Sequence, residues 1–318
     1  MRFLARLLFP ALLALATSAM AQAWPAKPIR WILTFPPGGP ADLTARQIAP
    51  HLQERLGQPI IVDNRPGGNS NIGFEAGARA PGDGYTMLFV VGAFVTNPHL
   101  YKLSWDPLKD FVPVAQLNQL QVMLLASAKF APNTLAEVMD HIRAKPGTVK
   151  CAWGGSILLG LACEVLKRDA KADITIVPYK GGAPAMNDLV GGHVDLMIDV
   201  MNTAVPQIKA GRVKPIAVAN PSRGRPPFAE LPAMSEVAPG FEMVPWQGVV
   251  MPAGTPKEIA ARMNREIIAA LQTPDMRQKY QDAGLDATFL TPEQFGEMMR
   301  RDYVKYGNLI RASGIKVD

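Results

Sequence analysis

Cysteine and histidine are scarce in this sequence, which limits the catalytic chemistry that it can support. The chain has two cysteines and four histidines, and no pair of the histidines has the spacing of a zinc site. No G-x-S-x-G segment marks a nucleophilic serine, and neither cysteine has a histidine near it in the sequence that would activate it. The sequence therefore predicts no enzyme, no metal site and no cofactor.

The two cysteines, Cys151 and Cys163, leave two interpretations open. In an oxidising compartment they can pair, and a separation of twelve residues does not prevent a disulfide. However, Cys151 ends a predicted strand and Cys163 lies in the helix that follows, which favours Cα atoms too far apart to bridge. We therefore favour two small buried apolar side chains over a disulfide.

Charge is weak and evenly spread. Lysine and arginine number 33 against 27 acids, a net charge of +6, and the first 23 residues carry Arg2 and Arg6 but no acid, so the rest has 6 − 2 = +4. No run of basic residues with interleaved aromatics occurs, so nucleic-acid binding is not indicated. A mild positive field suits an anionic ligand.

The N-terminus has the pattern of an export signal. Two arginines precede the apolar run from Leu7 to Ala16, which is too short to span a bilayer. Ala21-Gln22-Ala23 offers signal peptidase its small-x-small site, which predicts a signal peptide over 1–23. Cleavage two residues earlier and an uncleaved anchor remain as alternatives. No later segment has some twenty continuous apolar residues, so we expect a soluble protein in the periplasm.

Short apolar runs alternate with segments of helical periodicity, which predicts parallel strands joined by crossover helices. The expected strands cover 29–35, 59–63, 85–91, 148–152, 174–177, 194–199 and 213–219. Thr134, Thr255 and Thr291 each precede an acid or amide at the N3 position, which predicts three capped helix starts. Pro50 lies inside the first helical pattern, beginning near Asp42, and should kink or break that helix.

Two stretches, Val114–Leu125 and Val244–Met251, are the expected crossings between two α/β lobes. The first lobe is then built from 24–120 plus 248–318, and the second from 121–247. A chain that crosses twice leaves a cleft between its lobes, with the hinge beside it.

The segment Phe35–Asp42 runs from the end of a strand into the start of a helix and contains Pro36-Pro37-Gly38-Gly39. Ligands of open α/β sheets bind at such strand ends, where loop amides and a helix N-terminus attract anions. Asp42 is placed to cap the helix and so to hold the loop. The residues alone do not choose between an anion site and an ordinary turn.

A second strand-to-helix turn, Trp153-Gly154-Gly155-Ser156, offers another site. We interpret Ser156 as a helix cap before a ligand donor, while the Trp153 ring either packs on a ligand or covers the edge of the lobe. The glycine-rich run from Pro66 to Gly73 lacks the spacing of a phosphate loop or a dinucleotide fingerprint. It is interpreted as a structural turn with Asn or Ser capping.

Seven segments carry the motifs of one family. They are W-P-A-K-P-I-R-W-I-L-T-F-P-P-G-G-P-A-D (24–42), L-G-Q-P-I-I-V-D-N-R-P-G-G (56–68), P-G-D-G-Y-T-M-L (81–88), N-P-H-L-Y (97–101), V-P-Y-K-G-G-A-P-A-M-N-D-L-V-G-G-H-V-D-L-M-I-D (177–199), P-A-G-T-P (252–256) and A-S-G-I-K (312–316). On these segments the chain resembles the Bug (Bordetella uptake gene) family, the TctC-like substrate-binding proteins of tripartite tricarboxylate transporters.

The resemblance implies a type II periplasmic binding protein fold, with two α/β lobes of mainly parallel sheets joined by two crossover strands. It implies an extracytoplasmic receptor, monomeric, that closes on a small carboxylate and delivers it to a TctA/TctB-like permease. Further contacts map onto the loop after the third strand and onto the strand end before Met201. The residues so implied in ligand binding are Phe35, Pro37, Gly38, Gly39, Asp42, Ala93, Phe94, Trp153, Gly155, Ser156, Ile157 and Asp199.

The chain departs from its family at two places that matter for the ligand. Relatives commonly carry Thr-His where Ala93-Phe94 stands, and a Gly-Ser/Thr-x-x-His run in place of Ser156–Gly160. An unpaired polar group of a ligand against such an apolar wall loses roughly 1–3 kcal/mol. The resemblance therefore favours a carboxylate with an apolar or aromatic body, terephthalate-like or a medium-chain dicarboxylate, over citrate or aspartate.

Two other functions remain open at this point. A receptor of the same fold can present its ligand to a sensor kinase instead of a permease, and neighbouring genes would separate the two. A secreted enzyme on a two-lobed scaffold is the third candidate, and it would turn over a carboxylated substrate.

Overall fold

Two β-sheets form the framework, and the computed structural model describes them within residues 24–154, 156–169, 171–219, 228–239 and 241–313. The expected signal peptide over 1–23 lies outside these residues. The first sheet has the order β11 (Leu285–Ala287), β4 (Phe111–Leu120), β10 (Trp246–Pro252), β3 (Thr86–Val91), β1 (Ile29–Leu33) and β2 (Ile60–Asn64). The second has the order β7 (Thr175–Tyr179), β6 (Lys150–Gly154), β8 (Leu196–Val200), β5 (Val122–Ser127) and β9 (Val213–Val218).

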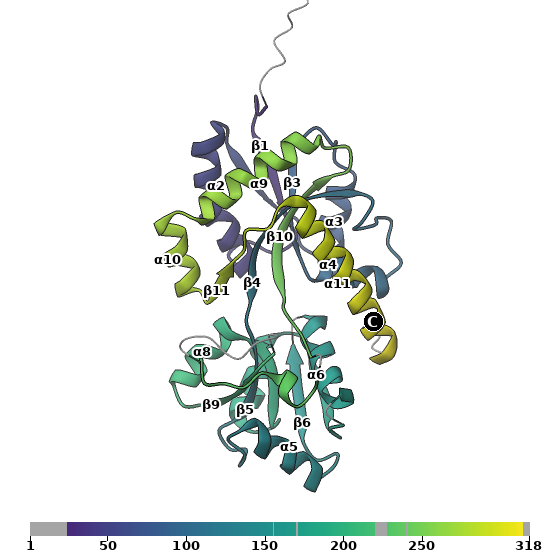
Figure 1. Ribbon diagram of the computed structural model, residues 1–318, viewed down its shortest axis with the longest axis vertical. Helices are drawn as coiled ribbons and strands as arrows, with labels where there is room; N and C mark the ends of the chain where they lie inside the picture. Colours follow the sequence, from purple (N-terminus) through teal and green to yellow (C-terminus); the bar gives the residue numbers. More distant parts are fainter. Residues whose placement is uncertain (1–23, 155, 170, 220–227, 240, 314–318) are drawn as a thin grey trace, which may run out of the picture.

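Helices cover both faces of each sheet, as Figure 1 shows. Around the first sheet they are α2 (Pro40–Leu56), α3 (Asn71–Ala78), α4 (Ala93–Thr96), α9 (Lys257–Leu271), α10 (Pro274–Asp282) and α11 (Pro292–Ser313). Around the second they are α5 (Leu135–Ala144), α6 (Ile157–Asp169), α7 (Gly182–Gly191) and α8 (Met201–Lys209). Among the described residues, no helix has both the length and the apolar character needed to cross a membrane.

Burial on both faces explains why the strands read as apolar runs. In β1, Ile29, Trp31 and Leu33 pack with α2 and α9, while Ile32 packs with α3 on the opposite face. Alternate residues of a strand point to opposite faces, so a sheet covered on both sides needs apolar residues at every position. The two-lobed α/β fold expected from the sequence is confirmed, and each of its two sheets mixes parallel and antiparallel strand pairs.

The strand pairing brings the carboxyl ends of the key strands toward the junction of the lobes. β1 and β3 are parallel, and β10 runs antiparallel to both β3 and β4. β4 therefore runs in the same direction as β1 and β3, and it leaves the first sheet at the edge where those strands end. β5 follows after the single residue Gln121 and lies antiparallel to β8, which runs parallel to β6. The carboxyl end of β6 thus faces the same junction (Figure 1), and so does that of β8, which is parallel to it.

Two of the three helix starts predicted from the sequence are confirmed. Thr134 and Glu137 form a capping box at α5, and Thr291 accepts from the amide of Gln294 at α11 while its own amide donates back to the Gln294 side chain. The third is wrong, because α9 has Pro256 as its N-cap, and the Thr255 hydroxyl donates to the Pro252 carbonyl instead.

The first helix also differs from its sequence-based description. It begins at Pro40, two residues before the expected start near Asp42, and it continues through Pro50 to Leu56 without a break. Pro50 is exposed, so its ring and the carbonyl that lacks an amide donor face water. Proline at the first helical position suits the start, because its fixed φ is already helical and its missing amide has no partner there.

Gly154, at the end of β6, lies against the turn before α7. A Cβ at Gly154 would stand 2.2 Å from the carbonyl oxygen of Gly181, which is backbone and cannot rotate away. Gly182, the first residue of α7, has open space around its Cα.

We therefore predict that Gly154→Ala destabilises the second lobe by about 1–3 kcal/mol through overpacking. Gly182→Ala is the matched control, and it should leave stability unchanged or raise it by up to about 1 kcal/mol. Urea unfolding of both variants measures the difference. Equal stability of the two variants would contradict the close backbone approach.

Candidate functional site

The loops at the facing edges of the two sheets touch each other directly. A Cβ at Gly92, the residue after β3, would lie 2.3 Å from Cδ1 of Leu158 in the first turn of α6. On the other side of the junction, the side-chain amide of Gln121 donates to Asp286 at 3.3 Å. The strand ends that were expected to hold a ligand therefore meet around the crossing strands.

Asp42 holds the first loop in shape. One carboxylate oxygen accepts from the amide of Gly38 (2.9 Å) and from Arg46 Nε (2.8 Å), and the other accepts from Asn64 Nδ2 (2.9 Å). The hydrogen bond from Arg46, with those from Gly38 and Asn64, outweighs burial and lowers the pKa of Asp42 to about 2. The expected role in fixing the loop is present, but the expected helix cap is wrong because Gly39 is the N-cap.

This arrangement changes which groups of the first loop can reach an anion. The amide of Gly38 already donates to Asp42, and Gly38 has a φ of +81°, which explains the glycine there. Pro37 and Pro40 have no amide hydrogen. No side chain caps the first turn of α2, so the amides of Gly39, Ala41 and Asp42 are the donors that a carboxylate would meet.

The turn that leads into α6 combines a cap with a packed ring. The Ser156 hydroxyl accepts from the amide of Leu158 at 3.3 Å, which confirms its interpretation as a cap. The Trp153 ring lies on α6 where glycine leaves room, since a Cβ at Gly160 would be 2.6 Å from Trp153 Cε2. Trp153 and Ile157 are both half-buried. Gly155 lies outside the described residues.

Asp199, at the end of β8, repeats the arrangement of Asp42 in the second lobe. Its carboxylate accepts from the amide of Val200 (2.8 Å) and from Thr203 Oγ1 (2.7 Å), and it is almost fully buried. Burial raises the pKa of Asp199, and the hydrogen bond from Thr203 only partly offsets this. The carboxylate therefore fixes the start of α8, which begins at Met201.

Phe94 lies inside the first lobe and not on its surface. Its ring has no exposed area and packs with Phe74, Trp105 and Phe111 at centroid distances of 5.0–5.4 Å. In this conformation Phe94 has no surface with which to touch a ligand. Ala93, the first residue of α4, is half-buried beside the contact between Gly92 and Leu158. Of Ala93 and Phe94, Ala93 is therefore the residue with exposed surface that can line a site.

One further turn at the junction was not recognised as a candidate site from the sequence. α7 follows β7, the neighbour of β6, and begins at Gly182 after Gly181, with no side chain capping its first turn. The signal was present, because Gly181-Gly182-Ala183-Pro184 repeats the pattern of Gly38-Gly39-Pro40, in which two glycines precede a proline in the first helical turn. Each lobe thus presents a Gly-Gly helix start at the facing edges.

The glycine-rich run from Pro66 to Gly73 is a structural turn, as predicted. The side-chain amide of Asn97 donates to the Asn69 carbonyl (2.8 Å) and to Asn71 Oδ1 (2.9 Å). The predicted side-chain capping is wrong, since Ser70 is the N-cap of α3 and makes no such hydrogen bond. The turn is therefore held by the segment that follows α4.

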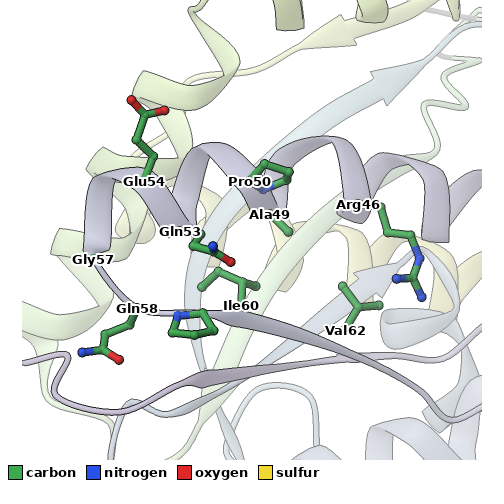
Figure 2. A pocket seen from close by; sticks show the side chains of 10 residues that line it. Arg46, Ala49, Pro50, Gln53, Glu54, Gly57, Gln58, Ile60 and Val62 are labelled. Atoms are coloured by element: carbon green, nitrogen blue, oxygen red, sulfur yellow. The ribbon is translucent and has the colours of Figure 1, made fainter.

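A groove on the outer side of the first lobe is a poor candidate for the site. Figure 2 shows it between α2 and the edge strand β2, with Arg46 at one end and Gly57 and Gln58 at the other. Its lining includes Pro59 and Ile60, at the amino end of β2. The groove thus extends away from the strand ends that meet at the junction.

Comparison with known proteins agrees with the fold. The model of the tripartite tricarboxylate transporter family receptor matches residues 44–315. A UPF0065 protein from the tcbD–tcbE intergenic region of Pseudomonas sp. (strain P51) is 34% identical over 293 residues, which cover 91% of this chain and 87% of that protein. Protein BugT of Bordetella pertussis is 32% identical over 322 residues, which cover 98% of this chain and 96% of that protein.

Solved structures of similar proteins include two with dicarboxylates. A Rhodopseudomonas palustris protein solved with adipate is 29% identical with a TM-score of 0.78, covering 92% of this chain and 99% of that one. MatC from the same organism, with bound malate, is 30% identical with a TM-score of 0.73, covering 90% and 100%. The periplasmic binding protein BugD is 30% identical with a TM-score of 0.74, covering 92% and 99%.

Asp42→Asn should destabilise the protein by about 1–2 kcal/mol at pH 7, because it weakens the hydrogen bonds from Arg46 and Gly38. The pKa in the folded state, about 2, lies below the ordinary value of 3.8. The advantage of wild type is therefore complete above pH 4 and shrinks as the pH falls toward 2.

Urea unfolding at several pH values measures the difference in the free energy of unfolding between wild type and Asp42→Asn. Asp140→Asn is the matched control, since Asp140 pairs with Arg143 on the exposed face of α5. Exposed pairs contribute little, so this variant should change stability by less than about 0.5 kcal/mol. A gap for Asp42→Asn that does not depend on pH would rule out the charged interaction.

Phe94→Ala should lower stability by about 3–5 kcal/mol, the usual loss for a buried phenylalanine. Phe289→Ala is the control, because Phe289 is 47% exposed and such changes usually stay within about 0.5 kcal/mol. Thermal unfolding of the two variants compares them. Wild-type stability of the Phe94→Ala protein would mean that the Phe94 ring is not buried in the core and can contact a ligand.

Proposed function

Because this chain belongs to the tripartite tricarboxylate transporter receptor family, we propose that it is the periplasmic receptor for a dicarboxylate with an apolar body. The family consists of solute-binding receptors and not of enzymes. The observation that carries the ligand class is the pair of Gly-Gly helix starts, one on each lobe, at the edges that face each other across the crossing strands.

Each helix start is suited to one carboxylate. The first-turn amides of α2 and α7 have no side-chain cap, and the helix dipole adds partial positive charge at the same place. The side chains that would repel an anion there, Asp42 and Asp199, already accept hydrogen bonds from their own turns. A ligand with a carboxylate at each end would therefore join the two lobes.

The wall between the two starts favours an apolar ligand body. Ala93 and Ile157 are half-buried next to the contact between Gly92 and Leu158. Neither side chain can pair a hydroxyl or an amino group, and an unpaired polar group loses about 1–3 kcal/mol. The adipate found with the Rhodopseudomonas palustris relative has this chemistry, with methylene groups between two carboxylates.

In this proposal the receptor is exported by residues 1–23, which are removed, and delivers its ligand to a TctA/TctB-like membrane permease. The family name implies that partner. Closure of the lobes around the ligand would give the permease a surface that the empty receptor lacks.

A thermal-shift comparison of adipate, hexanoate and citrate tests the proposal. A ligand at a hundred times its Kd stabilises the protein by about 2.7 kcal/mol, a shift of about 5 °C for a chain of this size. We expect this shift with adipate. Hexanoate lacks the second carboxylate and citrate adds a hydroxyl, so both should bind about 10-fold or more weakly.

Gly39→Val and Gly182→Val should each abolish most of the adipate shift by blocking the approach to one helix start. Both positions have room for a side chain, since the nearest atom to a Cβ at Gly39 is the Pro36 carbonyl oxygen at 3.6 Å, and Gly182 has nothing within 4 Å. Ala144→Val, on the exposed end of α5, should keep the full shift. The proposal fails if citrate alone stabilises the protein, or if both glycine variants respond to adipate like wild type.

A further inference from the structure

The two cysteine sulfurs lie next to each other in the second lobe. Cys151 Sγ and Cys163 Sγ are 2.9 Å apart, and neither residue has any exposed surface. Cys151 lies in β6 and Cys163 in α6, which packs on that strand. The Cys163 thiol also lies 3.8 Å from the carbonyl oxygen of Ala152, a long contact for a hydrogen bond.

This geometry removes the objection to a disulfide that the sequence raised. The covalent S–S bond measures about 2.05 Å, so the two sulfurs are roughly 0.9 Å from bonding distance. They already point at each other from elements that are packed together. A shift of the two sulfurs by less than about 1 Å in total would bring them to bonding distance.

We propose that Cys151 and Cys163 form an intramolecular disulfide in the exported protein. The proposal depends on the export that the proposed function assigns, because disulfides persist in the periplasm and are rare in the cytoplasm. The two thiols lose two protons and two electrons, and the electrons reduce the disulfide of an exported thiol oxidoreductase to its dithiol form.

The burial of both sulfurs decides when the bond forms. An oxidant cannot reach them in the folded lobe, and burial also raises the pKa of the Cys163 thiol, so little of the reactive thiolate is present. Oxidation must therefore take place while the lobe folds after export. Once formed, the bond is shielded from reductants for the same reason.

The bond would stiffen one side of the proposed ligand site. It closes the segment that leaves β6, passes through Trp153 and Ser156, and returns along α6. Within this segment the Trp153 ring lies over Gly160, and Ser156 caps α6. A loop tied at its base loses fewer conformations when it orders around a ligand. The disulfide thus adds a covalent restraint beneath the second-lobe turn.

Thiol counting on protein from the periplasm tests the bond. The full-length gene is expressed with export, and the purified protein is unfolded in urea with a maleimide reagent, with and without prior reduction. We expect no label without reduction and two labels after it, with a monomer on a non-reducing gel. One or two labels without reduction, or a disulfide-linked dimer, would overturn the proposal.

Thermal unfolding measures the effect of the bond on stability. One sample is first unfolded and refolded with a reductant present, and the other is refolded without it. The oxidised protein should unfold on the order of 5 °C higher than the reduced one. The double variant Cys151→Ala, Cys163→Ala is the control, and its unfolding temperature should not respond to reductant. An equal response from this variant would mean that the shift has another source.

Adipate binding to the same double variant separates this proposal from the proposed function. Binding that survives in the double variant, together with free thiols in wild type, would overturn the disulfide and leave the receptor intact. A disulfide in wild type without dicarboxylate binding would support the disulfide and overturn the proposed function. Reduced wild type should bind adipate more weakly than the oxidised protein, since its second-lobe turn is less restrained.

Discussion

The direction in which β4 and β5 carry the chain across the first crossing is the constraint on which the rest of the structure depends. β4 runs parallel to β1 and β3, so the chain leaves the first sheet at the edge where those strands end. β5 runs antiparallel to β8, so the chain enters the second sheet at the edge where β6 and β8 end. Strand ends in an α/β sheet lead into helix N-termini, and these are the positive ends of helices. With β4 and β5 reversed, strand starts and helix C-termini would face each other, and the junction would repel anions.

Backbone amides at the two Gly-Gly helix starts are the groups that we propose attract an anion at this junction. Two acidic side chains at the strand ends, Asp42 and Asp199, accept hydrogen bonds from the turns in which they lie. Asp42 is balanced by Arg46 and holds the amide of Gly38, and Asp199 holds the amide of Val200. Asp42 thus shapes the turn before α2, whose first-turn amides have no side-chain cap, and Asp199 shapes the start of α8. The first-turn amides of α7 likewise have no side-chain cap. Because those amides belong to rigid helix starts, they need no reorganisation when a ligand arrives.

Local patterns predicted most strands and helix starts, while contacts between distant segments did not follow from sequence. The inner strands are buried on both faces, so apolar runs mark them clearly, whereas β11 is only three residues long and half-buried and was not predicted. The hydroxyls of Thr134 and Thr291 act within one helical turn. The burial of Phe94 did not follow from sequence, because its neighbours in the aromatic cluster come from distant parts of the chain. The distance between Cys151 and Cys163 likewise depends on how α6 packs on β6. The Gly-Gly start of α7 could have been recognised as a candidate site by comparison with the first loop.

The hydrogen bonds of the crossing strands indicate where the lobes can move. Asn118 Nδ2 donates to Gln247 Oε1 at 2.9 Å between β4 and β10, and Trp246 Nε1 donates to Asp302 of α11 at 2.9 Å. Both pairs are buried, and a buried polar group that loses its partner costs about 1–3 kcal/mol. The strands up to these residues therefore belong to the rigid first lobe. By contrast, the contact between Gly92 and Leu158 is apolar and leaves no polar group unpaired when it opens. We therefore expect rotation between the lobes at Gln121 and at the residues just before Trp246, because these connect the paired ends of β4 and β10 to the second lobe.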